Sequence, residues 1–430
     1  YLYYTAFDGP MSHGYLFTLY AFILYLTNSW HNKPTNTKSV LLGLLTGLAT
    51  ITRPTEIILI LIPLLWNVYN KQTIIEKWKL LCANWKHVTV FAAGCIIGGL
   101  PQIIYWKIFS GDWLFYSYED QGFSFLNPHF SNFLFSYRKG WLIYTPAMIF
   151  ALMGFYTLYK YYKPLFLTSF IYFIVFLYIA ASWDIWWYGG SCTQRAIVQC
   201  YAVLMIPLTA FFSVNLKKKL ILGLPFLVFF TWINLFQLYQ VFGVGIMECD
   251  HMSKKYYWKI FGKTEIHPDD RKFLDTNEEA PEEVFKNFEI AYENDFEDSD
   301  GNNCEKSFSG NCSYKLNNEI QTTPEVSLSL NSNQKGWIKL SAYTFFKDKE
   351  YDTWKQTQMM ISFYKGTEKI KSKSIRIQRI REAGNWQEIY FESKIPHDKN
   401  PDYIKVYFWN SESDKTIYID NIKIFISSTK

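Results

Sequence analysis

The segment 183–195 carries more chemically useful side chains than a simple connection between two apolar runs requires. It holds aromatic rings, a carboxylate, an amide, a guanidinium group and adjacent glycines. Tryptophan and tyrosine also anchor proteins at the bilayer surface, so anchoring is one interpretation. The glycines and the Asp/Arg pair favour a binding site instead. The candidate substrate-binding residues are Trp183, Asp184, Trp186, Trp187, Tyr188, Gln194 and Arg195.

The segment 110–140 interleaves polar residues with aromatic ones. Rings that stack on sugar faces, beside carboxylates and amides that bind hydroxyl groups, would suit a ligand made of sugar and phosphate. Glu119 lies in this segment and is a further candidate for substrate binding. Amphipathic helices at a membrane surface would show a similar mixture, which is the alternative interpretation.

Three cationic residues, Arg53, Arg138 and Lys139, are candidates for binding a donor phosphate. Arg53 interrupts an apolar segment, and its planar guanidinium group suits bidentate recognition of phosphate. A charge at such a place is costly unless it faces a cavity, a partner or the membrane surface, so snorkelling toward lipid headgroups is the alternative. Pro54 fits the start of a second helical arm.

Asp8 and His13 lie just before the first long apolar run and are the candidate catalytic residues. Carboxylates and imidazoles can accept the proton of an attacking hydroxyl group. Either residue could instead contact the substrate or a divalent cation. A histidine at the end of a membrane span is also commonly a hydrogen-bonding group at the interface.

Two halves of different composition must position these residues. Residues 1–246 form a succession of apolar runs, whereas the chain beyond Met247 is polar and charged. We expect a multi-spanning helical membrane domain over 1–246, a linker over 247–284 and an all-β sandwich over 285–430. The net charge of +5 is small for 430 residues, so we expect no nucleic-acid partner.

The apolar runs predict several membrane-spanning helices, since a bilayer core about 30 Å thick needs about 20 apolar residues per helix. The predicted spans are 14–30, 88–109, 141–160, 164–182, 196–214 and 220–246. The segment 40–69 is interrupted at Arg53, and we expect a hairpin with that residue at its tip. Lysines gather at 33–38, 71–86, 160–163 and 217–219, which marks these loops as cytoplasmic.

This topology places residues 1–13, the tip at Arg53, both candidate segments and everything after 247 on the extracytoplasmic side. The candidate residues therefore gather on one face of a multi-pass plasma-membrane protein. Arg138 and Lys139 run against the positive-inside rule there, which an anionic ligand or an error in the topology would explain.

Short runs of alternating polar and apolar residues occupy the second half, beginning at 326, 337, 359, 386, 404 and 416. Period-two alternation with turn residues between the runs predicts an antiparallel sandwich. The order of these runs resembles the jelly-roll modules of carbohydrate-binding proteins. This resemblance implies a structural calcium ion, for which Glu297 and Asp420 are the candidate ligands. Cys304 and Cys312 flank a short turn, and an extracytoplasmic domain permits a disulfide between them.

Four pieces of the first half resemble the GT-C glycosyltransferases, nearest to the family 39 group of protein O-mannosyltransferases and aminoarabinose transferases. These pieces are 8–26, 43–54, 139–146 and 186–195. The resemblance implies that a sugar passes from a polyprenyl-phosphate donor to a glycan, lipid or protein acceptor on the outer face. It also implies a catalytic acid in a first outer loop, a second acidic position nearest His13, and a donor-phosphate contact at Arg53.

We therefore expect an integral-membrane glycosyltransferase with an outer β-sandwich. The chain begins at Tyr1 without a counterpart of the first-loop acid, so we expect upstream residues, including that catalytic acid, to be missing and this chain to be inactive alone. The competing interpretation is a non-catalytic transporter or scaffold for envelope glycan or lipid. Ionisable residues lie at the ends of the predicted spans rather than at their centres, which favours the enzyme.

Overall fold

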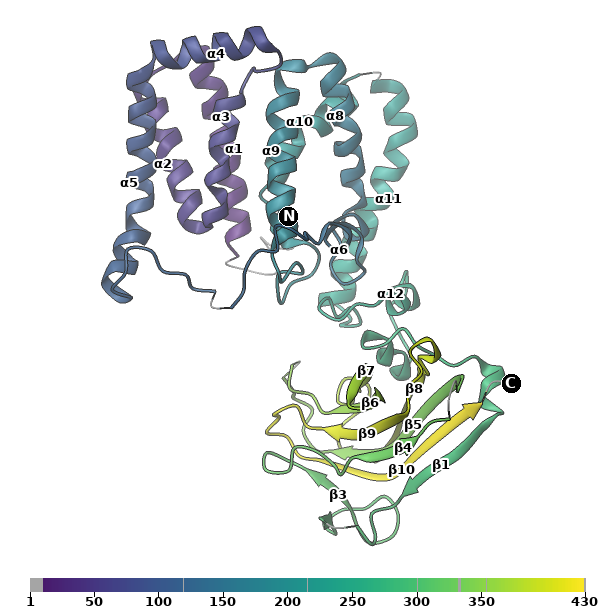
Figure 1. Cartoon of the computed structure of the whole chain (residues 1–430). Helices are drawn as coiled ribbons and strands as arrows, with labels where there is room; N and C mark the ends of the chain where they lie inside the picture. The colour runs from purple at the N-terminus through teal and green to yellow at the C-terminus, as the bar shows by residue number, and fades with distance from the viewer. Residues whose placement is uncertain are drawn as a thin grey trace. The chain divides into compact units, whose positions relative to one another are not determined.

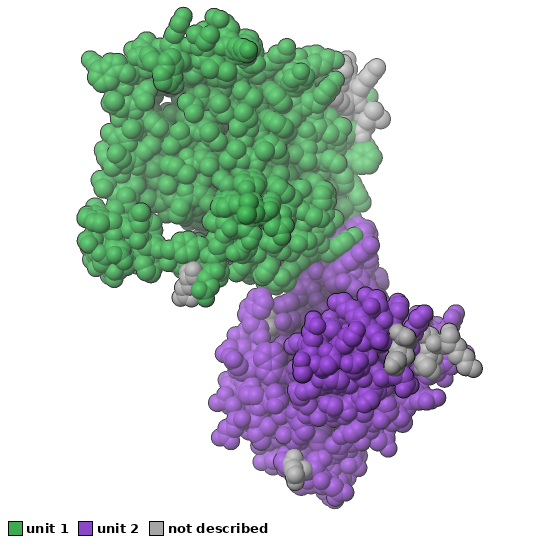
Figure 2. Space-filling view, in the orientation of Figure 1, with its two compact units in different colours: residues 1–250 green, residues 251–430 purple. Residues whose placement is uncertain are grey.

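The computed structural model describes residues 11–118, 120–214, 216–299, 301–331, 334–352 and 354–428. Asp8 and Glu119, two of the candidate site residues, lie outside the described residues. The chain forms two compact units, residues 1–250 and residues 251–430 (Figure 2). Each unit has its own hydrophobic core, and each is described by itself.

The regular elements of unit 1 in its described part are helices, joined by irregular segments (Figure 1). Its helices are α1 (Ser12–Asn32), α2 (Asn36–Thr52), η2 (Pro54–Ile60), α3 (Leu61–Leu65), α4 (Lys71–Ala83), α5 (Trp85–Phe109), α6 (Phe130–Phe135), α7 (Trp141–Tyr144), η3 (Pro146–Met148), α8 (Ile149–Tyr161), α9 (Lys163–Ser182), η4 (Arg195–Ile197), α10 (Tyr201–Ser213) and α11 (Leu216–Phe242).

The predicted hairpin around Arg53 is present. α2 ends at Thr52, Arg53 is extended (φ −150°, ψ 120°), and Pro54 begins η2, which continues into α3. The residue before a proline avoids the helical conformation, whereas proline itself suits the first position of a helix. The chain therefore reverses at Arg53 and returns along the bundle (Figure 1).

A second break differs from the sequence-based prediction of one helix over 141–160. There α7 stops at Tyr144, Thr145 is not helical, and Pro146 begins the short helix η3 ahead of α8. Among the described residues, the helical stretches long and apolar enough to cross a membrane are Trp85–Phe109, Lys163–Ser182 and Gly223–Phe242.

Helix α4 and the loop between α1 and α2, whose sequences carry lysines, lie at one end of unit 1, and the C-terminal end of α9 lies at the other (Figure 1). At one end, Lys38 Nζ donates to the carbonyl of Ser29 at 2.8 Å, and Lys77 Nζ donates to that of Pro63 at 3.2 Å. The N-terminal end of α1, the break at Arg53 and the segment 183–195 lie at the other end. The separation that the charge pattern predicts is therefore present.

Helices α2 and α5 approach each other closely through glycines. Each helix carries two glycines four residues apart: Gly43 and Gly47 on α2, and Gly94 and Gly98 on α5. A Cβ atom added at Gly43 would lie 2.1 Å from the carbonyl oxygen of Phe91, and one at Gly47 would lie 2.3 Å from that of Cys95. Small residues at this spacing let helix backbones pack directly against each other, as they do in membrane proteins.

Unit 2 is a β-sandwich preceded by short helices. The helices are α12 (Lys254–Ile260), η5 (Pro268–Leu274) and α13 (Glu282–Phe285), and η6 (His397–Lys399) precedes β9. The strands are β1 (Phe288–Asn294), β2 (Asn302–Asn303), β3 (Ser313–Leu316), β4 (Val326–Ser329), β5 (Gly336–Phe346), β6 (Gln358–Lys365), β7 (Glu368–Arg376), β8 (Gln387–Lys394), β9 (Tyr403–Trp409) and β10 (Ile417–Ser428).

Two antiparallel sheets enclose the core of unit 2. One sheet has the order β2-β3-β10-β5-β8, with β1 also paired to β10, and the other has the order β4-β9-β6-β7. Apolar side chains at alternate positions, such as Ile338 and Leu340 on β5 and Ile404 and Val406 on β9, are buried between the sheets. This is the packing that the period-two pattern predicts.

The segment 251–284, predicted as part of a linker, belongs to unit 2. Charged side chains bind it to the sheets. Asp275 pairs with Arg376 and Arg379, while the buried pair Lys272 and Glu392 lies 3.3 Å apart. Its polar composition resembles that of a free linker, but Lys272, Asp275 and Glu278 form ion pairs with residues on the strands.

Candidate functional site

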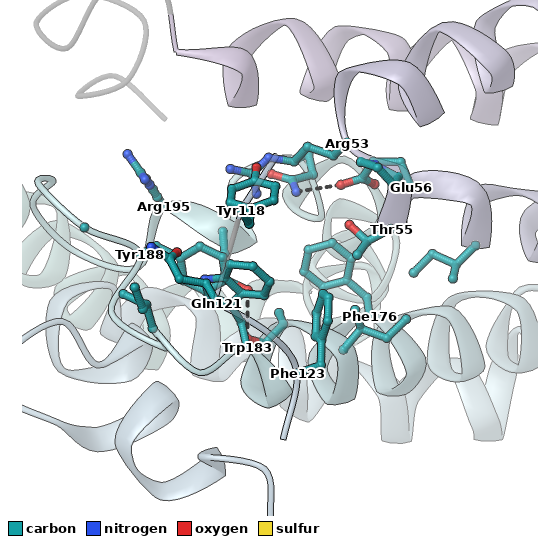
Figure 3. Close-up of a pocket in the computed structure, with 18 of the residues that line it drawn as sticks. Arg53, Thr55, Glu56, Tyr118, Gln121, Phe123, Phe176, Trp183, Tyr188 and Arg195 are labelled. Atoms are coloured by element: carbon teal, nitrogen blue, oxygen red, sulfur yellow. Dashed lines mark hydrogen bonds between the residues drawn. The ribbon is translucent and has the colours of Figure 1, made fainter. Parts of the chain in front are cut away.

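A cavity of about 320 Å³ lies between the break at Arg53, the segment 116–123 and the segment 183–199 of unit 1 (Figure 3). Its described lining includes two guanidinium groups, a carboxylate and several aromatic rings: Arg53, Glu56, Tyr116, Tyr118, Phe123, Phe176, Trp183, Tyr188 and Arg195. Figure 3 shows Arg195 and Tyr188 on one side and Thr55 and Glu56 on the other. The hairpin tip and the aromatic segment therefore share one cavity.

A chain of hydrogen bonds between side chains holds Arg53. Its Nη2 atom lies 3.0 Å from Nε2 of His13. Because a guanidinium group can only donate, this imidazole nitrogen accepts, and the other ring nitrogen carries the hydrogen. Nδ1 of His13 then donates to Oε1 of Gln199 at 2.9 Å. His13 is fully buried and positions the arginine, and it is not among the described residues that line the cavity.

Glu56 lies at the other end of this chain, and the sequence analysis did not single it out. Nε2 of Gln199 donates to Oε1 of Glu56 at 3.0 Å, and the hydroxyl of Tyr20 donates to Oε2. The hydroxyl of Tyr172 donates in turn to Tyr20. A carboxylate inside the apolar segment 54–65 was the available signal, since ionisable residues in such segments commonly serve a function.

Asp184 fastens two cavity walls together rather than pointing a free carboxylate into the cavity. It accepts hydrogen bonds from the backbone N–H of Gly122 at 3.1 Å and from the hydroxyl of Ser124 at 2.5 Å. These bonds position the neighbouring Trp183, whose ring packs edge-on against Tyr118 with centroids 5.1 Å apart. Trp183 and Tyr118 both line the cavity.

A tight turn at Tyr188 and Gly189 shapes the rest of this wall. Both residues have positive φ angles, of 55° and 63°, a conformation that glycine adopts at little cost. The Tyr188 hydroxyl donates to the carbonyl of Ala180 at 2.8 Å, which keeps its ring against the cavity. Gln194 closes the turn by donating to the carbonyl of Trp186 at 3.0 Å.

Arg138 and Lys139 do not belong to the described cavity lining, although the sequence makes them candidates for phosphate binding. The Arg138 guanidinium lies 4.1 Å from the ring centre of Trp187 and donates through Nε to the carbonyl of Asp250 at 2.7 Å. Lys139 is fully buried and bonds to the Asp250 carboxylate and to the carbonyl of Gly189. Burial lowers the pKa of Lys139 to about 8, although Asp250 opposes this shift.

Trp186 and Trp187 pack edge-on with ring centroids 5.7 Å apart, and neither is among the described lining residues. Arg138 packs against Trp187, so these three side chains form a contiguous cluster outside the described cavity lining. Lys139 thus has an anionic partner within the chain, the Asp250 carboxylate, which the sequence analysis did not consider.

A disulfide between Cys192 and Cys249 links the 183–195 segment to the residue just before Asp250. The sequence analysis proposed no disulfide for Cys192 or Cys249, which are 57 residues apart in the chain. In unit 2, Cys304 and Cys312 form the disulfide that their spacing predicts.

Glu297 and Asp420, the candidate calcium ligands, each cap a backbone loop. Glu297 accepts from the N–H groups of Asn311 and Cys312 at 2.7 and 2.9 Å. Asp420 accepts from the N–H groups of Phe308 and Ser309 at 2.7 and 3.2 Å. No cluster of three or more metal-ligating side chains occurs in the part of the chain that the structure describes.

No protein-family model matches the chain, and no curated protein matches it. Among solved structures, the chain is similar to a family 16 carbohydrate-binding module (TM-score 0.22, 16% identity, 29% of this chain and 82% of that chain). It is also similar to the CBM22-1 xylan-binding domain from Paenibacillus barcinonensis Xyn10C (TM-score 0.24, 11% identity, 33% and 97%). The C-terminal family 22 carbohydrate-binding module of Clostridium thermocellum Xyn10B gives a TM-score of 0.23 at 16% identity, over 33% of this chain and 95% of that chain. The sandwich architecture of unit 2 is defined by the strand pairing described above.

Proposed function

We propose that the chain is a membrane glycosyltransferase that moves a sugar from a polyprenyl-phosphate donor to an acceptor on the extracytoplasmic face. One observation carries the proposal: Arg53 and Arg195 line the same aromatic cavity as Trp183, Tyr118 and Tyr188. Guanidinium groups suit a phosphate, whereas aromatic rings suit the face of a sugar and an isoprenoid chain. Apolar helices beside the cavity would let the donor's lipid lie in the bilayer.

In the proposed reaction, an acceptor hydroxyl oxygen attacks the anomeric carbon and forms the new glycosidic bond. The bond between that carbon and the phosphate oxygen breaks, its electron pair stays on the phosphate, and polyprenyl phosphate leaves. Fixed guanidinium groups stabilise the negative charge that develops on this phosphate. The hydroxyl proton passes to a base. Nε2 of His13 already accepts a hydrogen bond from Arg53, so His13 positions the arginine and does not serve as this base.

Glu56 acts in this proposal as a positioning residue. Its two carboxylate oxygens accept from Tyr20 and Gln199, and Gln199 orients His13 against Arg53. The guanidinium group is therefore held before the ligand arrives, so less free energy is lost in ordering it.

Substitution of Arg53 tests the proposal in the full-length protein, with transfer from a polyprenyl-phosphate sugar as the assay. We expect Arg53→Ala to lower turnover about 100- to 1,000-fold, the usual cost of losing one preorganised charge-stabilising group. Arg53→Lys should retain part of this activity, because an ammonium keeps the charge but loses the bidentate geometry. Lys163→Ala, at the exposed N-terminal end of α9 and at the opposite end of unit 1, is the matched control.

Turnover by Arg53→Ala equal to that of the wild type would refute the assignment of Arg53. A wild-type protein that binds the lipid-linked sugar and never transfers it would support the transporter or scaffold instead.

A further inference from the structure

A second cavity, of about 160 Å³, lies at the lysine-bearing end of unit 1. It is formed by the ends of α1, α2, α3, α4 and α5, and its lining is almost entirely apolar. Leu64 and Val88 line it and are also exposed on the protein surface, so the cavity opens to the outside of the bundle. None of its described lining residues lines the cavity around Arg53.

Two ring nitrogens in the lining lack hydrogen-bond partners among the described residues. One is Nε1 of Trp30, whose side chain is 94% buried, given its 6% exposure, and the other is Nδ1 of His87. An indole nitrogen can only donate, so it requires an acceptor. A buried donor without a partner is unfavourable, and such groups in folded proteins commonly meet a ligand or an ordered water. Trp30 is a lining residue, so its unpartnered N–H lies at the wall of a mostly apolar space.

The surroundings of the cavity are strongly basic. The segments 29–40 and 70–91 contain the lysines 33, 38, 71, 77, 79 and 86, and Glu76 is their only acidic residue. Lys77 bonds to two lining residues, His31 and Pro63, and so lies at the cavity edge. α4 also exposes Ile74, Ile75 and Trp78. A helix that carries lysines beside exposed apolar residues is typical of a membrane surface with anionic lipids.

We propose that this cavity binds an anionic phospholipid, with the ester region and the first part of an acyl chain inside and the phosphate headgroup among the lysines. A phospholipid places an ester carbonyl between its charged headgroup and its apolar chain. The Trp30 N–H donates to that carbonyl, and the apolar lining covers the adjoining methylene groups. A polyprenyl phosphate has no such carbonyl, so the cavity is distinct in chemistry as well as in place from the proposed donor site.

Native mass spectrometry of the purified full-length chain in detergent tests this site without any sugar donor. The probes are phosphatidylglycerol and phosphatidylcholine with identical acyl chains, and soluble glycerol phosphate as a competitor. We expect phosphatidylglycerol to reach half-maximal binding at a lipid concentration about tenfold lower than phosphatidylcholine requires. Glycerol phosphate should not displace it. Trp30→Phe removes the donor while keeping a ring, and should weaken retention of phosphatidylglycerol about fivefold.

A second variant fills the cavity instead of removing the donor. Leu64→Trp adds volume at an exposed lining position, where little else must move, and should also abolish the preference for phosphatidylglycerol. Lys107→Gln, at the far end of α5, is the control that should bind as the wild type does. Equal binding of the two lipids, displacement by glycerol phosphate, or unchanged binding by Leu64→Trp would each overturn the proposal. Loss of sugar transfer would not bear on it, because no transfer is measured.

Discussion

Glu56 connects the two ends of a network that no short motif contains. Its carboxylate accepts from Tyr20, which is 36 residues away, and from Gln199, which is 143 residues away. Through Gln199 and His13 the network reaches Arg53, the residue on which the proposed chemistry depends. The carboxylate therefore stabilises the network through its two acceptor oxygen atoms as well as through its charge.

Replacing Glu56 with glutamine should destabilise unit 1. The new amide has one NH₂ group that must face Tyr20 or Gln199, and a donor would then meet a donor in a buried site. We expect a loss of about 1–3 kcal/mol in the free energy of unfolding, measured by denaturation in detergent. Glu76→Gln on α4, where the carboxylate accepts from exposed Gln72, should change the stability little. Equal effects of the two substitutions would contradict the network.

For single residues, the sequence predicted which side chains have suitable chemistry better than it predicted which groups they contact. Arg53, Trp183, Tyr188 and Arg195 were chosen for chemistry and do line the cavity. Arg138 and Lys139 were chosen by the same criterion, yet they bond to Asp250, more than 100 residues along the chain. The neighbouring sequence does not predict this partner, because the two segments come together only when the chain folds.

The glycine pairs of α2 and α5 set how closely these helices pack. Alanine substitutions at two glycines can distinguish the effect of close backbone contact from the effect of helix propensity. Gly47→Ala would place a Cβ atom 2.3 Å from the carbonyl oxygen of Cys95, whereas Gly99→Ala on α5 would meet only the Ile51 side chain, at 4.0 Å. We expect Gly47→Ala to lower the unfolding free energy by about 1–3 kcal/mol. Gly99→Ala should be neutral or stabilising, since alanine is the better helix former. Denaturation of both variants in detergent measures the difference, and equal stability would show that α2 and α5 are not in direct backbone contact.

In unit 2, Glu278 joins the segment before the sandwich to two strands. It bonds to Lys371 at 3.0 Å, to the hydroxyl of Ser393 at 2.8 Å and to the N–H of Lys394 at 2.9 Å. Burial alone would raise the pKa of Glu278, but these hydrogen bonds and the charge of Lys371 outweigh it and leave the pKa below its usual value.

A lowered folded-state pKa means that Glu278 stabilises the fold above the usual glutamate pKa and that this contribution disappears as the pH falls through the folded value. We therefore expect wild type to be more stable than Glu278→Gln at pH 7 and the difference to disappear as the pH falls through the lowered, folded-state pKa. Thermal unfolding of unit 2 within the full chain, followed by circular dichroism, measures both. Glu293→Gln, at a side chain that is 64% exposed, is the control. A stability difference that persists unchanged in acid would contradict the role of the carboxylate.

Elements were predictable where a local pattern defines them. The alternating runs at 326, 337, 359, 386, 404 and 416 all become strands, whereas β7, rich in lysine, lacks the apolar alternation and was missed. Proline marks the breaks at Pro54 and Pro146, but only the first was predicted, because the apolar run around the second was counted as one helix.

Across the whole of unit 1, lysine placement predicted which loops share an end, and that division holds in the structure (Figure 1). It could be predicted because the positions of the lysines can be read along the chain without knowing how the helices pack. The Cys192–Cys249 disulfide was not predictable in this way, since it joins segments 57 residues apart. Together with Lys139 and Asp250, it fixes the wall on which Tyr188 and Arg195 lie.

The central claim is that Arg53 and Arg195 hold a lipid-linked phosphate in the aromatic cavity. An experimental structure of the full-length protein with a non-hydrolysable polyprenyl-phosphate sugar tests it most directly. We predict that the phosphate lies within hydrogen-bonding distance of both guanidinium groups, at about 2.7–2.9 Å, with the sugar against Trp183 and Tyr118. A phosphate bound elsewhere in unit 1, with this cavity free of ligand, would contradict it.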